Sequence, residues 1–284
     1  MIELEHEEGR AVSLHLAGRL LCRYVYVPEG PVNESLKPYF HPVNSLAGDT
    51  LTNFRPNDHP WHHGLSLTLN SVSGVNFWGG PTCVRGSGYQ WLANHGSQQH
   101  VAWIRLRAEG TTASLVQLLE WRHEAEVLFR EERTIHIAVD QTAQMWSLRW
   151  LSRLTNVSGR TLTLGNPHSE GGLAGSHYTG LQFRGARELL DDHLDPTIKV
   201  VAEGGLEGVA AVHGARARWM EWHGQLDTTL NRIVIRFENN AGPLNWFMRR
   251  NSPLAAFPVQ FDQNLELATG EQLALDHTLT FTQA

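Results

Sequence analysis

Residues 101–154 read VAWIRLRAEGTTASLVQLLEWRHEAEVLFREERTIHIAVDQTAQMWSLRWLSRL, and this segment is the strongest sign of the architecture. Apolar and polar side chains alternate in four long stretches, which span 101–106, 113–121, 127–139 and 145–154. Turn residues such as Glu109-Gly110 separate the stretches. Alternation with a period of two is typical of β-strands. The segment therefore predicts four successive strands joined by short turns, that is, an antiparallel meander.

Similar alternation continues on both sides of the meander. It is visible at 12–16 and 65–69 before the meander, and at 232–238 after it. Residues 265–281 read as a strand, a Gly-Glu turn and a second strand, which predicts a closing hairpin. The sequence shows no long apolar pattern of helical period, no internal repeat and no linker. We therefore expect residues 1–284 to form a single all-β domain, one large antiparallel β-sandwich of the supersandwich kind.

Composition limits the classes of partner. The chain has 284 residues, a net charge of -6 and only 18% charged residues. An acidic balance argues against a nucleic-acid partner, because phosphate binding needs a basic surface. We see neither a signal peptide nor an apolar run long enough to span a bilayer, so we expect no membrane association and a cytoplasmic location. Cys22 and Cys83 are expected as buried thiols, with one disulfide between them left open. A homo-oligomer also stays open.

The segment Asp58-His59-Pro60-Trp61-His62-His63-Gly64 is the main candidate for chemistry. Imidazoles are well suited to proton transfer near neutral pH and to metal binding. In extended chain, His59, Trp61 and His63 would share a face opposite His62. In a helical turn beginning at Pro60, all three histidines would crowd one side. Both geometries let two imidazoles converge, so a divalent metal is an open alternative, with His59, His62 and His63 as its ligands.

Further candidates come from glycine-rich segments and from one strand. Trp78 and Trp91 lie among glycines that let aromatic rings approach a sugar, although core packing is the simpler interpretation for either one alone. His95 belongs to a second polar segment with two histidines. In the strand 127–139, at least one of Glu131, Glu132 and Arg133 must face inward. A buried charge there needs a partner, which Glu and Arg can provide for each other, but an inward Glu131 is also a candidate general base.

Several motifs together resemble the bacterial PmoA-like family. They are PYFHPV at 38–43, DHPWHHG at 58–64, VNFWGG at 75–80, GSHYTGLQFR at 175–184 and WFMR at 246–249. The chain has His177-Tyr178-Thr179-Gly180 where family members usually carry a Gly-Tyr-Gly-Gly-like stretch. The family is often called methane oxygenase, but a methane monooxygenase subunit spans the membrane, which this chain is not expected to do. Genes of the family often accompany sugar oxidoreductases, so the resemblance implies keto-sugar or glycoside metabolism.

The expected closing hairpin, Leu-x-Leu-x-x-Gly-Glu-x-Leu from Leu265 to Leu273, resembles the end of galactose-mutarotase-like β-supersandwich domains. Such domains act on sugars with a concave sheet, a histidine acid and a carboxylate base. This second resemblance again implies a sugar substrate and acid/base chemistry.

We therefore predict a carbohydrate-active enzyme: an epimerase, lyase or hydrolase that acts on a sugar or keto-sugar by histidine-mediated proton transfer. The expected catalytic residues are His59, His63 and Glu131. The expected substrate-binding residues are Trp61, His62, Trp78, His95, Tyr178, Arg184 and Arg249. Two alternatives remain, a non-catalytic sugar-binding module and a metal-dependent oxygenase of jelly-roll type. The oxygenase would use two or three of these histidines with Asp58 or a Glu, but the cupin-like His-x-His spacing is absent.

Overall fold

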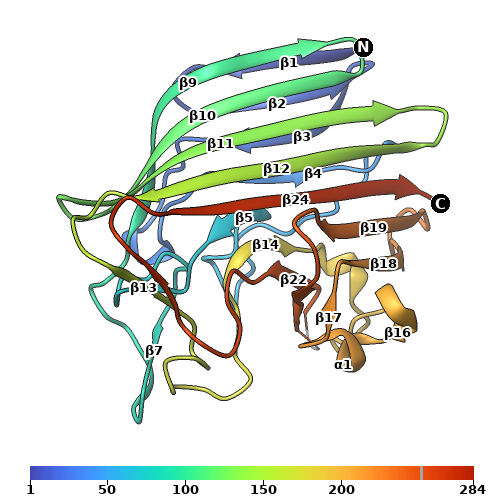
Figure 1. Ribbon diagram of the computed structural model, residues 1–284. Coiled ribbons are helices and arrows are strands. Elements are labelled where there is room, and N and C mark those ends of the chain that lie inside the picture. The colour runs from blue at the N-terminus through green and yellow to red at the C-terminus, as the bar shows by residue number, and fades with distance from the viewer. Residues whose placement is uncertain (250–251) are drawn as a thin grey trace.

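The computed structural model describes residues 1–249 and 252–284, and over these residues it is nearly all antiparallel β-structure. Two large sheets face each other (Figure 1). The first has nine strands, in the order β16 (Leu206–Glu207), β15 (Lys199–Ala202), β18 (Trp219–Gln225), β19 (Arg232–Asn239), β24 (Gln272–Gln283), β12 (Met145–Asn156), β11 (Glu126–Asp140), β10 (Thr112–His123) and β9 (Ser97–Glu109). The second has eight, in the order β1 (Ile2–Glu7), β2 (Ala11–Leu16), β3 (Arg19–Val25), β4 (Tyr39–Val43), β5 (Leu65–Thr68), β14 (Gly180–Arg184), β22 (Leu254–Phe257) and β21 (Phe247–Met248).

Smaller elements surround the sheets. They are the three-stranded sheet β23 (Leu265–Leu267), β13 (Leu162–Gly165) and β6 (Ser71–Val72), and the pairs β17 (Arg216–Ala217) with β20 (Leu244–Asn245) and β7 (Thr82–Val84) with β8 (Gly88–Gln90). The helical turns are η1 (Val32–Glu34), η2 (Arg187–Leu189), η3 (Glu203–Gly205) and α1 (Val209–Val212). In Figure 1 the hairpin of β7 extends away from both sheets, on the side where the long loops gather.

The predicted meander is confirmed as β9 to β12, which pair in succession. The inward side chains of these strands meet those of the eight-stranded sheet in one apolar core. Five tryptophans in the chain are fully buried: Trp121, Trp146, Trp150, Trp222 and Trp246. Burial of such large apolar surfaces is the main favourable term in folding. The predicted fold class, an antiparallel all-β sandwich, is therefore confirmed.

The predicted closing hairpin is wrong, although both of its strands exist. β23 pairs with β13, where Leu267 opposes Leu162, and β24 enters the nine-stranded sheet between β12 and β19. The Gly270-Glu271 turn thus carries the chain from one sheet to another. Local alternation shows that a strand forms but does not specify its partner, because pairing depends on distant segments.

A buried polar layer lies between the two large sheets. Glu131 and Arg133 on β11 have fully buried side chains and form a two-point ion pair, with Nε–Oε1 and Nη2–Oε2 distances of 2.8 and 2.7 Å. Arg133 also donates to the hydroxyl of Tyr24 on β3, across the sandwich, at 3.0 Å. Glu131 accepts from Trp121 Nε1 at 2.7 Å and from the Ser152 hydroxyl. The predicted structural pairing of Glu131 with Arg133 is confirmed, and the pair links the sheets.

We predict that His277 makes the fold sensitive to acid. Its ring is buried against Phe257, at 4.3 Å between centroids, and burial lowers its pKa to about 3. In the unfolded chain the pKa is about 6.5, so between these values the unfolded state binds the extra proton and stability falls as the pH falls. This group should remove about 1 kcal/mol of unfolding free energy between pH 6 and pH 5. Urea unfolding at pH 6 and at pH 5 measures this. Between these two pH values, His277→Phe should lose about 1 kcal/mol less unfolding free energy than the wild type loses. Equal losses would contradict the prediction.

Both cysteines are free thiols, with Cys22 buried on β3 and Cys83 half-buried on β7. The expectation of buried thiols therefore holds for Cys22, and burial raises its pKa. Within the described residues, no helix has the length and apolar character needed to cross a bilayer.

Candidate functional site

A cavity of about 710 Å³ lies on the outer face of the eight-stranded sheet. On β14 and β22, Phe183 and Ala255 point into the sandwich core, whereas Arg184 and Leu254 point the other way and line the cavity. Loops complete the wall. The cavity brings together seven of the predicted site residues: His59, Trp61, His62, Trp78, Tyr178, Arg184 and Arg249.

The histidine segment reaches this cavity through two consecutive turns. The amide of His59 donates to Pro56 O at 2.9 Å, and the amide of His62 donates to His59 O at 3.0 Å. The chain then returns to the sheet at Gly64, where a Cβ would lie 2.1 Å from the carbonyl oxygen of Phe40. Neither the extended nor the helical alternative is therefore correct. Tight turning places His59 and His62 at the cavity and directs His63 to the opposite side.

His59 lies between a carboxylate and a second imidazole. Its Nδ1 is 3.1 Å from Asp58 Oδ2, and both side chains are about half exposed. Its ring stacks on His62, with centroids 5.0 Å apart and planes at 26°. Burial raises the pKa of the Asp58 carboxyl, but His59, the backbone amide of Asp58 itself and the charge of Arg184 together outweigh burial, and the net pKa is lowered. The contact with His59 Nδ1 lacks hydrogen-bond geometry. The charge of the Asp58 carboxylate still favours a proton on Nδ1 of His59, which leaves Nε2 as the proton acceptor. The sequence offered Asp58 only as a metal ligand.

His62 and Arg184 are buried at the cavity with polar atoms that lack partners. His62 is 4% exposed, and burial, aided by the charge of Arg184, lowers its pKa well below the usual value. It is therefore a neutral imidazole at physiological pH. Among the described residues, neither His62 Nδ1 nor Arg184 Nε has a hydrogen-bond partner. Buried polar groups are normally paired, so these two atoms point to a polar ligand or water in the cavity.

Aromatic rings form the apolar wall of the cavity. Trp78, Tyr178 and Phe247 belong to a small apolar cluster that is separate from the sandwich core, with Trp61 packed against it. Trp78 and Tyr178 contact each other at 4.8 Å between centroids. The guanidinium carbon of Arg249 lies 5.7 Å from the centre of the Tyr178 ring. The simpler interpretation of Trp78 as a sandwich-core residue is therefore corrected, and Trp91 is 61% exposed rather than buried.

A buried lysine holds two of these loops together. The ammonium of Lys37 donates to the carbonyl oxygens of Trp61 at 3.2 Å and of Trp78 at 3.0 Å, and also to those of Glu34 and Ser35. Its side chain is completely buried. Lys37 thus positions the backbone beneath both tryptophans. Sequence reasoning missed this residue because nothing in its neighbourhood distinguishes it from an exposed lysine.

Three predicted site residues lie outside the cavity. Nε2 of the buried His63 contacts Glu34 Oε2 at 2.9 Å and Pro60 O at 3.1 Å, and burial lowers its pKa to about 4. His95 donates from Nε2 to Gly80 O at 2.8 Å. Glu131 lies in the polar layer between the sheets. The sequence placed His63 and His95 in one site with His59 and His62. This is corrected, because Nε2 of each ring is engaged by local partners outside the cavity.

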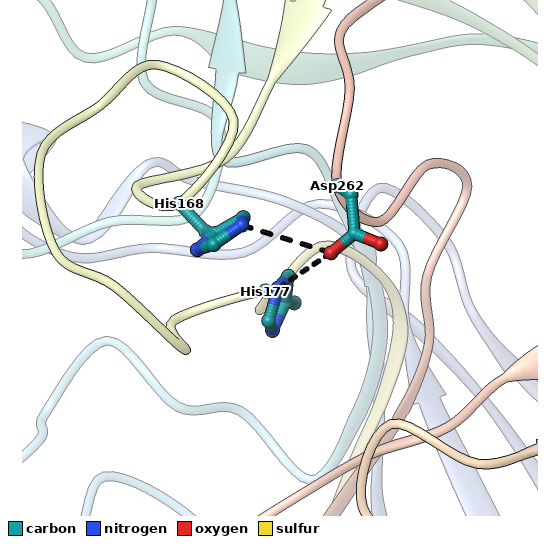
Figure 2. Close-up of side chains that lie close together, drawn as sticks. All are labelled: His168, His177 and Asp262. Atoms are coloured by element: carbon teal, nitrogen blue, oxygen red, sulfur yellow. Dashed lines mark ion pairs between the residues drawn. The ribbon is translucent and has the colours of Figure 1, made fainter.

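The sequence left open a metal held by His59, His62 and His63. These three rings do not converge, since His63 faces Glu34. Within the described residues, donor atoms suited to one ion gather instead at His168, His177 and Asp262, all within 4.8 Å of one another (Figure 2). His177 directly precedes Tyr178, and Leu173 of the loop between the two histidines lines the cavity. The sequence showed both histidines but gave no sign that Asp262 joins them from a loop about 85 residues further along the chain.

Comparisons with known proteins place the chain in a family. The sequence pattern of DUF6807, a family of unknown function, matches residues 11–284. No curated protein sequence matches the chain.

Among solved structures, a protein from Synechocystis sp. is similar with a TM-score of 0.41 and 11% identity, covering 100% of this chain and 96% of that one. A galactose mutarotase related enzyme from Lactobacillus acidophilus has a TM-score of 0.39 and 8% identity, covering 100% and 98%. A putative kojibiose phosphorylase from the human microbiome has a TM-score of 0.31 and 8% identity. The match covers 59% of this chain and only 17% of that one. All three TM-scores are below 0.5, so these similarities carry no argument about function.

Proposed function

This chain belongs to the DUF6807 family, whose function is unknown, and we propose that its cavity binds a sugar or keto-sugar on which His59 acts as a proton-transfer group. The observation that carries the proposal is the combination of an aromatic wall, two buried polar atoms without partners, and an imidazole beside a carboxylate. The resemblance to the PmoA-like family points to the same substrate class and stays a prediction.

The cavity has the size and lining that a sugar requires. Small-molecule sites usually measure about 300–1,000 Å³ and combine apolar walls with a few placed polar groups. The C–H faces of a pyranose ring pack on indole and phenol rings, here Trp61, Trp78 and Tyr178. Its hydroxyl groups need both donors and acceptors, which Arg184, Arg249 and the neutral His62 provide. A mono- or disaccharide is therefore the proposed ligand.

The polar side of the cavity supports proton transfer. With the charge of Asp58 favouring a proton on Nδ1, Nε2 of His59 accepts a proton from the substrate and can return it to another position. If the substrate is a keto-sugar, the proton leaves a carbon next to the carbonyl, and a guanidinium stabilises the resulting enolate oxygen. The imidazole of His59 together with a guanidinium of the cavity could serve an epimerase, a lyase or a hydrolase. These remain the proposed reaction classes.

A binding experiment tests the ligand class. Tryptophan fluorescence titrated with a panel of aldoses, keto-sugars and disaccharides should change for at least one member. Trp61→Ala should weaken that binding by roughly tenfold or more, because stacked aromatic contacts contribute about 1 kcal/mol beyond the area they bury. Trp219→Ala is the matched control, since Trp219 packs on Arg236 in the nine-stranded sheet, outside the cavity-lining set. No response to any sugar, or equal loss in both variants, would contradict the proposal.

A further inference from the structure

We propose that His168, His177 and Asp262 form a binding site for one divalent transition-metal ion at the edge of the cavity. The inference goes beyond the proposed sugar chemistry and does not depend on it. The three residues come from two parts of the chain: His168 and His177 from the segment between β13 and β14, and Asp262 from the loop between β22 and β23. Figure 2 shows the two imidazoles directed toward the same carboxylate.

The distances suit a single ion. Asp262 Oδ1 lies 3.3 Å from His177 Nε2 and 3.6 Å from His168 Nε2. Metal–ligand bonds of about 2.0–2.2 Å in tetrahedral geometry separate neighbouring ligand atoms by roughly 3.3–3.6 Å. Both nitrogen–oxygen distances therefore already match the spacing that one ion would impose, and the two nitrogens lie within 4.8 Å of each other.

His177 is the buried ligand, and its ring nitrogens make no hydrogen bond in the described structure. It is 6% exposed, and neither ring nitrogen has a hydrogen-bond partner among the described residues; the 3.3 Å contact with Asp262 lacks hydrogen-bond geometry. Its ring stacks on Phe261 at 3.7 Å with planes at 6°, which fixes the ring orientation.

The two loops that carry the ligands are held in place. The amide of Gly175 donates to Nδ1 of His168 at 3.1 Å, so the neutral ring carries its proton on Nε2. Metal-binding histidines usually donate from their second nitrogen, so an ion at Nε2 would replace this contact and move the proton to Nδ1. The side-chain amide of Asn166 donates to Phe261 O at 2.8 Å, which ties the histidine loop to the residue next to Asp262. The two loops that carry the ligands are therefore tied together without an ion.

The donor set indicates the class of ion. Two imidazole nitrogens and one carboxylate oxygen suit Zn²⁺, Fe²⁺, Mn²⁺ or Ni²⁺, and they are a poor set for Ca²⁺ or Mg²⁺, which prefer oxygen ligands. Three protein ligands leave coordination positions open to water or substrate. Because the Asp262 side chain is 72% exposed, a bound ion would be reached from solvent.

Metal titration of the full chain, purified without a histidine tag and treated with chelator, tests the site. Isothermal titration with Zn²⁺, and separately with Mn²⁺ and Ni²⁺, should show one ion per chain for at least one metal. That metal should also raise the melting temperature. Asp262→Ala and His168→Ala should each weaken binding by at least about tenfold and abolish the thermal shift, because each removes a ligand. His177→Ala is less informative, since it also removes the stacking on Phe261.

The matched control is Asp58→Ala, which removes a half-exposed carboxylate beside His59, away from the proposed metal ligands. It should bind the metal as the wild type does. Unfolding of Asp262→Ala and His168→Ala without metal should follow the wild-type curve, because both side chains are at least one-third exposed. Absence of stoichiometric binding by the wild type, or loss of binding only in the Asp58 variant, would overturn the site. Neither result depends on sugar binding, so failure here leaves the proposed function to its own test.

Discussion

Replacing His59 with alanine is expected to lower turnover of the sugar substrate by roughly 10²–10⁴-fold, the usual cost of removing a positioned proton-transfer group. The physical reason is the Asp58 carboxylate 3.1 Å from Nδ1, whose charge favours a proton on that nitrogen and leaves Nε2 as the acceptor. Sugar binding should change much less, because Trp78, Tyr178 and Arg184 remain in place. The measurement is steady-state turnover on the sugar that gives the strongest fluorescence response.

The chain offers a close control for this variant in His223. Its Nε2 contacts Glu221 Oε2 at 3.0 Å, and its side chain is 43% exposed, against 45% for His59. It lies on β18 in the nine-stranded sheet and is not part of the cavity. His223→Ala should therefore keep wild-type turnover. If both variants are equally active, His59 is not a catalytic residue; if the wild type binds sugars but turns none over, the sugar-binding module is the better interpretation.

Replacing Glu131 with leucine is expected to lower the unfolding free energy by about 3–5 kcal/mol, because it leaves the guanidinium of Arg133 buried without a counter-charge. Both side chains have no exposed surface, and every oxygen of Glu131 has a partner. Urea unfolding monitored by near-ultraviolet circular dichroism measures the loss. A general base would instead show a large loss of turnover with stability retained.

Two variants sharpen the interpretation of that loss. Glu132→Leu changes the neighbouring residue, which points outward and is 45% exposed beside Arg153 at 3.7 Å. Such exposed pairs contribute about 0–1 kcal/mol, so this variant should stay close to the wild type. Adding Arg133→Met to Glu131→Leu removes both buried charges and should restore part of the lost stability. A double variant less stable than Glu131→Leu alone would show that the charge imbalance is not the cause.

The strands could be predicted from the sequence, whereas their partners could not. Alternation identified β9 to β12. One face of β10, β11 and β12 is buried, so a period of two is unavoidable there, whereas β9 is only partly buried, through Trp103 and Leu106. It also identified β23 and β24 but paired them wrongly with each other. Partner choice depended on β13 and β19, which lie far away along the chain, and no local pattern encodes such contacts.

The candidate site shows the same division. Residue types that are rare outside functional sites led to His59, Trp61 and His62 in one segment, and the structure brings them to one cavity. The direction of each side chain could not be predicted. His63 points away from the cavity because two successive turns precede it, and Glu131 faces the sandwich interior, where it pairs with Arg133. Lys37 and Asp262 were missed. Each lies in a loop whose local sequence is ordinary, and its contacts at the site come from segments that are distant along the chain.

The position of β24 in the nine-stranded sheet also constrains the order in which the molecule can form. Among the described residues of this sheet, β24 alone joins β9 to β12 with β15, β16, β18 and β19, because it lies between β12 and β19. During synthesis, β12 and β19 therefore have unpaired edges until β24 emerges. Exposed edges recruit other strands, and pairings between distant segments form slowly. Aggregation of nascent chains should accordingly depend more on how fast residues 272–283 dock than on the stability of the finished sandwich.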